Sequence, residues 1–262
     1  MTTTAQVTFD SYKDFKGYVI NLDREHWRYD EAQCKLTELG FSNVVRWEAT
    51  DYNREDVNTE VRRMGAKRLE RFVNDAEIAL VLSHYRVWAN FLSGKEQYCL
   101  VFEDDVVGVP NFAAVADFND LSYGDFDLLC FGGIFLDITD SSGSRSYTDL
   151  ATVCNQQGDK SYVSNASFWQ SHAYLISREG AYKLMAGYPI WMSLEESRQP
   201  QVDNYISNYR VPRTVLAVNR ELGDPKGYSL SWQIHPEYGD LSKRVCGILL
   251  QEKSFKSTIF NV

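Results

Sequence analysis

The sequence predicts an α/β fold with a mostly parallel central sheet, and two observations support this prediction. Short apolar runs that are typical of buried strands alternate along the chain with segments that have helical periodicity. The run "YCLVF" at 98–102 is continuously apolar, as expected of a central strand that is covered on both faces. Ligands of such sheets bind outside the carboxyl ends of the strands, so residues that follow a strand are candidate site residues.

The first elements are predicted from apolar runs and helix formers. The run "GYVINL" at 17–22 is bounded by glycine and aspartate, which predicts a buried strand. Residues 25–39 contain good helix formers and end at Gly40, a residue type favoured directly after a helix. A second strand is expected at 44–50, and the highly charged stretch 53–74 is expected to be an exposed helix or loop.

A long buried helix is predicted over 76–93. Asn74 or Asp75 is a candidate N-cap, and Gly94 ends the apolar pattern. Apolar residues recur at helical spacing on one face, and further apolar residues make a second face. We therefore expect this helix to be buried on two sides.

Strands and helices continue to alternate in the second half of the chain. We expect, in chain order, a helix over 111–120, a strand over 126–131, a strand over 172–177, a helix over 178–187, a helix within 200–210 and a strand over 214–218. The segment 137–166 is rich in Ser, Asp, Gly and Asn, which predicts one long loop. We interpret residues 1–262 as a single domain whose first part, 1–15, is loosely ordered.

Composition argues against several classes of protein. A net charge of −9 over 262 residues disfavours non-specific binding to nucleic acid or to an anionic membrane. The five cysteines are scattered and form no CxxC pair, so neither a zinc site nor a disulfide framework is indicated. No apolar stretch is long enough for a transmembrane helix, and the N-terminus lacks the features of a signal peptide. These features predict a cytoplasmic protein and leave open a peripheral association with a membrane.

Three adjacent carboxylates follow the central strand, in "LVFEDDV": Glu103, Asp104 and Asp105. Asp23 and Asp51 follow two other predicted strands, so acidic side chains converge at one edge of the sheet. Such a cluster suits Mg²⁺ or Mn²⁺, which bind one or two protein carboxylates together with substrate phosphates. A solvated turn is the simpler alternative. Phosphotransferases with Asp-x-Asp after a strand use the first aspartate as nucleophile, and Glu103 in that position argues against them.

Four segments, in order and with fitting spacing, resemble the motifs of glycosyltransferase family 25, which contains lipooligosaccharide galactosyltransferases and procollagen galactosyltransferases. The segments are "VINLDRE" at 19–25, "AEIALVLSHYRVW" at 76–88, "LVFEDDV" at 100–106 and "SHAYLISREGAYKL" at 171–184. Ala76 and Ala79 depart from the pattern, because the family usually has glycines at these two positions.

This resemblance implies a GT-A fold, which is a Rossmann-like α/β domain that binds a nucleotide-sugar. It further implies an inverting, Mn²⁺-assisted (or Mg²⁺-assisted) transfer from a nucleotide-sugar, commonly UDP-galactose in the family, to a hydroxyl of a glycan acceptor. The acceptor would be part of a glycolipid, as in lipopolysaccharide, or of a glycoprotein. The alternative is a non-catalytic nucleotide- or glycan-binding protein with a degenerate glycosyltransferase fold.

The resemblance also implies roles for individual residues. The expected donor contacts are Asn21, Leu22, Asp23, Arg24, Thr50, Asp51, Ser83, His84, Glu103 and Asp104. Asp105 is the expected direct metal ligand, with Glu103 beside it and His235 as a late-chain ligand. Asp203 is the expected general base, with Glu195 and Glu196 as alternatives. A purely structural role for His84 stays open, because buried histidines are often simply hydrogen-bonded.

Overall fold

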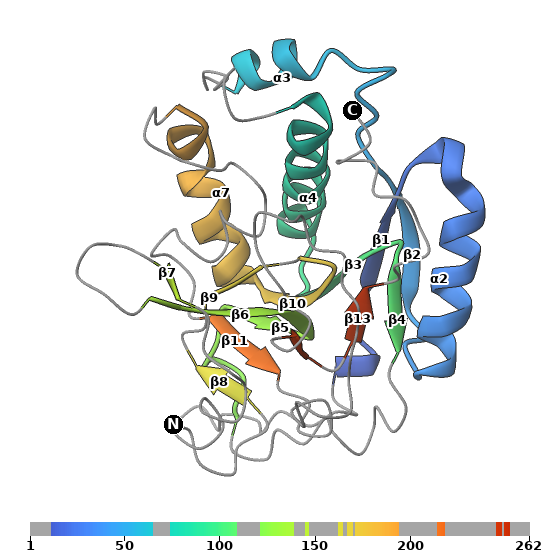
Figure 1. Cartoon of the computed structure of the whole chain (residues 1–262), viewed down its shortest axis with the longest axis vertical. Helices are drawn as coiled ribbons and strands as arrows, with labels where there is room; N and C mark the ends of the chain where they lie inside the picture. Colours follow the sequence, from blue (N-terminus) through green and yellow to red (C-terminus); the bar gives the residue numbers. More distant parts are fainter. Residues whose placement is uncertain are drawn as a thin grey trace.

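The computed structural model describes residues 12–64, 74–108, 121–138, 145–146, 162–164, 167–169, 171–193, 214–217, 245–247 and 249–251. Its main body has three layers, with one mixed sheet between two layers of helices. Helix α2 (His26–Glu38) covers one face, and helices α4 (Asp75–Ser93) and α7 (Arg178–Ser193) cover the other (Figure 1). The predicted α/β class is confirmed.

The main sheet has seven strands. Their spatial order is β2 (Val44–Glu48), β1 (Gly17–Asn21), β3 (Tyr98–Glu103), β10 (Ala173–Ser177), β5 (Leu128–Cys130), β11 (Thr214–Ala217) and β8 (Tyr162–Ser164). Strand β1 pairs in parallel with both β2 and β3, and β11 pairs in parallel with β5. Strand β10 runs antiparallel between β3 and β5, which the sequence pattern did not indicate. The carboxyl ends of β1 and β3 therefore lie side by side.

Smaller sheets lie beside the main one. They contain β4 (Val106–Gly108), β6 (Gly132–Ile138), β7 (Arg145–Ser146), β9 (Ser167–Trp169), β12 (Val245–Gly247) and β13 (Leu249–Gln251). The prediction of one loop over 137–166 is wrong where β7, β8 and the end of β6 lie. Strands this short show too few alternating positions to be recognised from sequence.

The helices begin and end close to the predicted residues. A short 3₁₀ helix, η1 (Asp23–Glu25), leads into α2, and Gly40 follows α2 with a left-handed φ of 94°. Helix α3 (Val57–Arg63) lies in the predicted charged stretch. Helix α7 continues to Ser193, beyond the predicted end at 187. In the described part of the chain, no helix is long and apolar enough to cross a membrane.

Helix α4 has the predicted N-terminus at Asn74. The Asn74 side chain accepts a hydrogen bond from the Glu77 N–H at 2.8 Å, and the Glu77 carboxylate accepts one from the Asn74 N–H at 2.8 Å. This reciprocal capping box satisfies two backbone donors that would otherwise lack helical partners. It fixes where α4 begins, beside the end of the sheet that carries the acidic cluster.

Alternate residues of the strands divide the core into two apolar clusters. On β3, Cys99 and Val101 face α4, whereas Leu100 and Phe102 face the α2 side, and all four are buried. The predicted two-sided burial of this strand is therefore confirmed. Each fully buried side chain of this size contributes about 1.5–3 kcal/mol. By the same alternation, Glu103 projects toward the α4 face.

Some expectations concern residues near or beyond the edges of the described ranges. Residues 12–15 are described, and Tyr12 is fully buried against Phe41 and Phe131, so this part of the segment expected to be loose is packed. The helices predicted over 111–120 and within 200–210 lie outside the described residues.

Candidate active site

A pocket of about 100 Å³ lies at the carboxyl ends of β1 and β3, beside the first turns of α4. Six of the predicted site residues line it: Leu22, Thr50, Ser83, Glu103, Asp104 and Asp105. Thr50 comes from the segment after β2, so three neighbouring strand ends contribute to one wall. The predicted convergence of strand-end residues is therefore present in the structure.

Asn21 connects the end of β1 to the acidic cluster. Its side chain is buried and donates hydrogen bonds from Nδ2 to Asp104 Oδ2 at 2.8 Å and to the Glu25 carbonyl at 3.0 Å. Its Oδ1 accepts a hydrogen bond from Arg46 Nε at 2.8 Å. The amide thus uses both its donor and its acceptor, and it holds Asp104 in place from the neighbouring strand.

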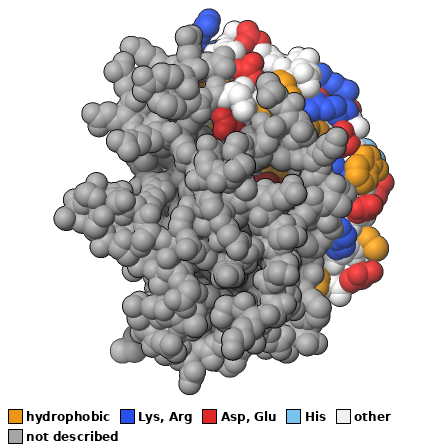
Figure 2. Space-filling model, in the orientation of Figure 1, with side chains coloured by type: hydrophobic (Ala, Val, Ile, Leu, Met, Phe, Trp, Pro, Cys, Tyr) orange, Lys and Arg blue, Asp and Glu red, His pale blue; other side chains and the backbone are white. Residues whose placement is uncertain are grey.

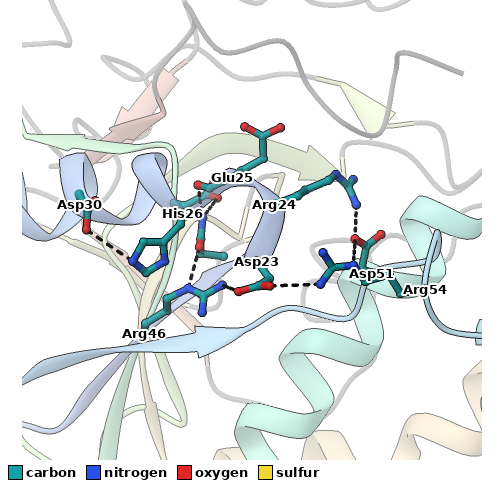
Figure 3. A network of polar contacts seen from close by, with 10 residues as sticks. Asp23, Arg24, Glu25, His26, Asp30, Arg46, Asp51 and Arg54 are labelled. Carbon is teal, nitrogen blue, oxygen red and sulfur yellow. Dashed lines mark hydrogen bonds and ion pairs between the residues drawn. The ribbon is translucent and has the colours of Figure 1, made fainter.

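A network of charged side chains lies beside the pocket, at the ends of β1 and β2 (Figure 3). Asp23 pairs with Arg46 at 3.2 Å and with Arg54 at 3.1 Å, and Arg24 pairs with Asp51. Hydrogen bonding to Arg54 is the main reason that the pKa of Asp23 lies below its usual value. Burial alone would raise the pKa of Asp51, but the hydrogen bonds from Arg24 and the Asn53 N–H and the charges of Arg24 and Arg54 together outweigh it, and the pKa is lowered.

Arg24 pairs with an aspartate from another segment of the chain and not with its sequence neighbour Asp23. Arg24 reaches across to Asp51 instead, while Asp23 is held by Arg46 and Arg54. Arg54 also lies 3.9 Å from Asp51 through Nε, so it links the two strand-end aspartates into one network.

The three adjacent carboxylates have different partners, which explains how they can lie together. Glu103 Oε1 accepts a hydrogen bond from the Ser171 hydroxyl at 2.8 Å and lies 3.5 Å from His84 Nε2. Asp104 Oδ1 lies 2.6 Å from Arg28 Nη2, and Asp105 Oδ2 lies 3.9 Å from the same nitrogen. Arg28 on α2 is thus the positive partner of this cluster, a role that the sequence did not predict.

Burial and neighbouring charges shift the acidity of this cluster in opposite directions. Burial raises the pKa of Asp104 to about 6, although Arg28 and Asn21 act to lower it. Burial would also raise the pKa of Glu103, but hydrogen bonding by His84 and by the Ser171 hydroxyl holds it below its usual value. Glu103 is therefore the more firmly ionised of the two neighbours.

Ser83 and His84 act from within helix α4. The Ser83 hydroxyl donates to the Ala79 carbonyl at 2.7 Å and accepts a hydrogen bond from the Thr50 N–H at 2.9 Å, which ties α4 to the end of β2. His84 is fully buried, with Nδ1 2.8 Å from the Tyr174 hydroxyl. His84 lies beneath the pocket and contacts Glu103, which lines it. The donor contacts expected for Ser83 and His84 stay predictions.

Arginines gather at this edge although the chain as a whole is acidic. Arg24, Arg28, Arg46 and Arg54 all take part in the ion pairs around the ends of β1, β2 and β3, in a chain with a net charge of −9. On the face seen in Figure 2, acidic and basic side chains are interspersed among the described residues. A concentration of guanidinium groups beside a strand-end pocket favours an anionic ligand such as a phosphate.

Comparison with known proteins identifies the family of this site. Residues 15–197 match the family model described as glycosyltransferase family 25 (LPS biosynthesis protein). The chain belongs to glycosyltransferase family 25. The matched range contains the pocket and its acidic cluster, so the described site lies in the glycosyltransferase domain.

Curated relatives from insects support the family assignment. A protein named "Glycosyltransferase 25 family member" from Aedes aegypti is 30% identical over 201 residues, which cover 72% of this chain and 30% of the relative. A protein of the same name from Drosophila pseudoobscura pseudoobscura is 26% identical over 185 residues, 66% of this chain and 27% of the relative. The chain thus spans roughly a third or less of the length of the curated relatives that it matches.

The described part of this family 25 domain does not form a complete metal cage. Among the residues that the structure describes, no group of three or more His, Cys, Asp or Glu side chains is placed to hold a metal ion. The carboxylates that line the pocket nevertheless fit a hard cation in the form in which one or two protein oxygens and a substrate diphosphate share it. Asp203, Glu195, Glu196 and His235 lie outside the described residues.

Four contributing residues of this domain were not assigned a site role from sequence: Arg28, Arg46, Ser171 and Tyr174. Arg28 follows Arg24 by four residues, and this helical spacing on the segment after a strand is the one signal that indicates a basic side chain near the cluster. Tyr174 lies on β10, and Ser171 lies two residues before this strand begins. Their contacts depend on the antiparallel pairing of β10 with β3, which no local pattern encodes.

Proposed function

We propose that this chain is a glycosyltransferase that moves a sugar from a nucleotide-sugar, with UDP as the nucleotide, to a hydroxyl group of a glycan acceptor. The observation that supports this most is the pocket at the ends of β1 and β3, lined by Glu103, Asp104 and Asp105, within a glycosyltransferase family 25 domain. In an α/β sheet this edge is where nucleotides bind. The GT-A arrangement expected from the sequence is part of the proposal.

The charged residues around the pocket have roles that follow from the chemistry of the donor. Arg24 and the neighbouring arginines would contact the diphosphate, because a guanidinium group donates two parallel hydrogen bonds to phosphate oxygens. Thr50 and Asp51 would accept hydrogen bonds from the ribose hydroxyls. Asn21, Leu22, Asp23, Ser83, His84, Glu103 and Asp104 complete the proposed donor contacts.

We include Mn²⁺ or Mg²⁺ as the proposed metal. Asp105 would be its direct ligand, with Glu103 beside it and His235 as the candidate ligand from late in the chain. When bound, the cation would act as a Lewis acid that neutralises charge on the diphosphate leaving group. The residues of the chain would position the donor and exclude water from it.

Inverting transfer requires a base that takes the proton from the attacking acceptor hydroxyl. Asp203 is our candidate, and Glu195 and Glu196 are the alternatives. Asp203→Asn is expected to leave donor binding nearly unchanged and to lower the rate of transfer by about 10²–10⁴-fold. Unchanged transfer by this variant would assign the base to another residue.

The first test of the proposal is donor binding. Thermal unfolding is measured with UDP- and GDP-sugars, each with and without Mn²⁺, because a ligand that binds the native state stabilises it by about 2.7 kcal/mol at 100 times its dissociation constant. We expect a UDP-sugar to stabilise the wild type only when Mn²⁺ is present.

Asp105→Asn tests whether this carboxylate binds the cation. Asp30→Asn, at an exposed position on α2, is the matched control. We expect the first variant to lose the Mn²⁺-dependent stabilisation and sugar turnover, and the second to keep both. The metal assignment is wrong if Asp105→Asn responds to Mn²⁺ and donor as the wild type does.

One observation favours the alternative of a non-catalytic binding protein. Arg28 already neutralises part of the acidic cluster, with 2.6 Å between Arg28 Nη2 and Asp104 Oδ1, so less positive charge is needed from a bound cation. A binding protein would show nucleotide-sugar binding without Mn²⁺ and neither transfer nor hydrolysis of the donor. The proposed enzyme would show Mn²⁺-dependent consumption of the donor.

A further inference from the structure

We propose that Tyr174 and Trp88 are positioning residues that hold the Glu103 carboxylate through the ring of His84. The inference deepens the proposed function, because it concerns how one wall of the donor pocket is kept in place. The three side chains lie beneath the pocket and do not line it, whereas Glu103 does. They form one connected path from the apolar core to the pocket.

The path consists of three consecutive contacts. Trp88 Nε1 donates to the Tyr174 hydroxyl oxygen at 2.9 Å, the same hydroxyl lies 2.8 Å from His84 Nδ1, and His84 Nε2 lies 3.5 Å from Glu103 Oε1. Trp88, Tyr174 and His84 are each at most 1% exposed. Water is therefore excluded from these contacts, and each side chain depends on the next for its polar partner.

The hydrogen-bonding properties of Trp88 and Tyr174 determine which nitrogen of the His84 ring carries the proton. An indole N–H can only donate, so the Tyr174 oxygen accepts from Trp88. Burial raises the pKa of Tyr174 well above its usual value, so the phenol keeps its proton. His84 Nδ1, 2.8 Å away, can accept that proton, and a neutral ring that accepts at Nδ1 carries its own proton on Nε2, which lies 3.5 Å from Glu103 Oε1.

The backbone makes this arrangement rigid. His84 and Trp88 are one helical turn apart, so they project from the same face of α4. Tyr174 lies opposite Val101 in the register of β10 and β3, two residues before Glu103. The Glu103 N–H also donates to the His172 carbonyl at 2.8 Å, so strand pairing and side chains locate the same residue.

One hydrogen-bond donor and the His84 ring, at an ion-pair distance of 3.5 Å, therefore meet at the same oxygen of Glu103. The Ser171 hydroxyl and the His84 ring both approach Oε1, and among the described residues no recorded contact uses Oε2. Oε2 is the atom that a hydroxyl of the nucleotide-sugar or a metal-bound water would contact. Holding Oε1 from below fixes the direction in which Oε2 points, which is the expected contribution of the path to donor binding.

The first experiment reads the ring directly and needs no substrate. Histidine is labelled with ¹⁵N in the whole protein, and the His84 signals are assigned by their loss in His84→Gln. We expect Nε2 to carry the proton and Nδ1 to behave as an acceptor, and Tyr174→Phe to change this state. A proton on Nδ1 in the wild type would overturn the proposal.

The second experiment asks whether Tyr174 acts through Glu103. Donor affinity is measured for Tyr174→Phe, Glu103→Gln and the double variant, with Tyr182→Phe as the control because Tyr182 is 65% exposed on α7. We expect Tyr174→Phe to weaken donor binding about tenfold, as the loss of one hydrogen bond that supports a charged group would. In the Glu103→Gln background the same change should have no further effect.

The two experiments separate this inference from the proposed function. Equal weakening by Tyr174→Phe in both backgrounds would indicate a general structural role and overturn the positioning role. If the wild type binds no nucleotide-sugar, the proposed function fails, and the labelled ring alone decides whether the path fixes His84 as inferred.

Discussion

At the residue scale, the carboxylates at the edge of the sheet all have basic or hydrogen-bonding partners, and this pairing makes the site possible. Asp104 is held by Arg28 and Asn21, Glu103 by His84 and Ser171, and Asp51 by Arg24. Breaking a buried ion pair by removing one partner commonly costs about 3–5 kcal/mol, because the other charge stays buried. Removing Arg28 is therefore expected to be more damaging than removing an arginine from the exposed face.

The pair of Arg24 and Asp51 gives a prediction with a defined pH dependence. The pKa of Asp51 is lower in the folded chain than its ordinary value, so the pair stabilises the fold above about pH 4 and this stability is lost as the pH falls through the folded-state pKa. Arg24→Gln should lower the free energy of unfolding by about 1 kcal/mol at pH 7, and the difference from wild type should shrink below about pH 4.

Urea unfolding at pH 7, 4 and 3 measures this difference, because only the lowest of these values lies in the range where Asp51 becomes protonated. Arg62→Gln, an exposed position on α3, is the control and should match the wild type at each pH. A difference that stays constant or grows as the pH falls would contradict the assignment of the pair.

The sequence indicates which acidic residues meet, and it does not indicate their partners. Strand-end positions are visible as polar residues that follow apolar runs, so Asp23, Asp51 and the cluster after β3 could be predicted to converge. The partners Arg28, Ser171 and Tyr174 reach the site through a helix and an antiparallel strand whose placement is a tertiary property. Their roles therefore required the structure.

At the scale of elements, the start of α7 is closely fitted to both α4 and β5. Arg178 donates to the carbonyls of Leu92 at 2.9 Å, Phe91 at 3.2 Å and Gly94, and Nε donates to Glu96 at 2.9 Å. One guanidinium group thus satisfies carbonyls at the end of α4 that have no helical partner. The two helices are joined end to start on the same face of the sheet.

Gly180 is required by this fit. A Cβ at this position would lie 2.4 Å from the Asp127 carbonyl oxygen, a backbone atom that cannot move away easily. We expect Gly180→Ala to destabilise the fold by about 1–3 kcal/mol, as overpacking in a tight contact does. Tyr182→Ala, two residues further along α7 and exposed, is the control and should change stability much less. Equal midpoints of urea unfolding for Gly180→Ala and wild type would show that the contact can relax.

Helix predictions succeeded where capping residues mark the ends. Asn74 and Gly94 bound α4, and Gly40 follows α2, as the sequence indicated. The end of α7 was predicted at Gly187, but the helix passes through this glycine and continues to Ser193. No other glycine marks the end of the helix up to that residue. Local end signals work only when tertiary packing does not extend the helix beyond them.

At the scale of the whole molecule, the buried thiols report how completely the main sheet is shielded from solvent. Cys99 on β3 and Cys130 on β5 are buried, whereas Cys34 on α2 is exposed. Burial raises the pKa of Cys99 to about 12, so this thiol is protonated at neutral pH and does not act as a nucleophile. We expect iodoacetamide to label Cys34 in the native protein and Cys99 and Cys130 only after unfolding.

Mass spectrometry of the digested peptides separates these three positions. Labelling of the buried thiols should follow the global unfolding free energy as urea is added, because they lie in central strands. If Cys99 were labelled as fast as Cys34 in the absence of urea, the burial of Cys99 in the main sheet would be contradicted.

The antiparallel strand β10 has a consequence for how the protein is made on the ribosome. The block β2–β1–β3 is encoded by the first part of the chain, yet its open side is covered only by residues 173–177. Until those residues have been translated, β3 is an unpaired edge with exposed backbone groups, which are prone to join other chains. A nascent chain therefore cannot finish the wall around Glu103 early, and the interval before β10 emerges is the stage of synthesis at which this fold most needs protection by chaperones.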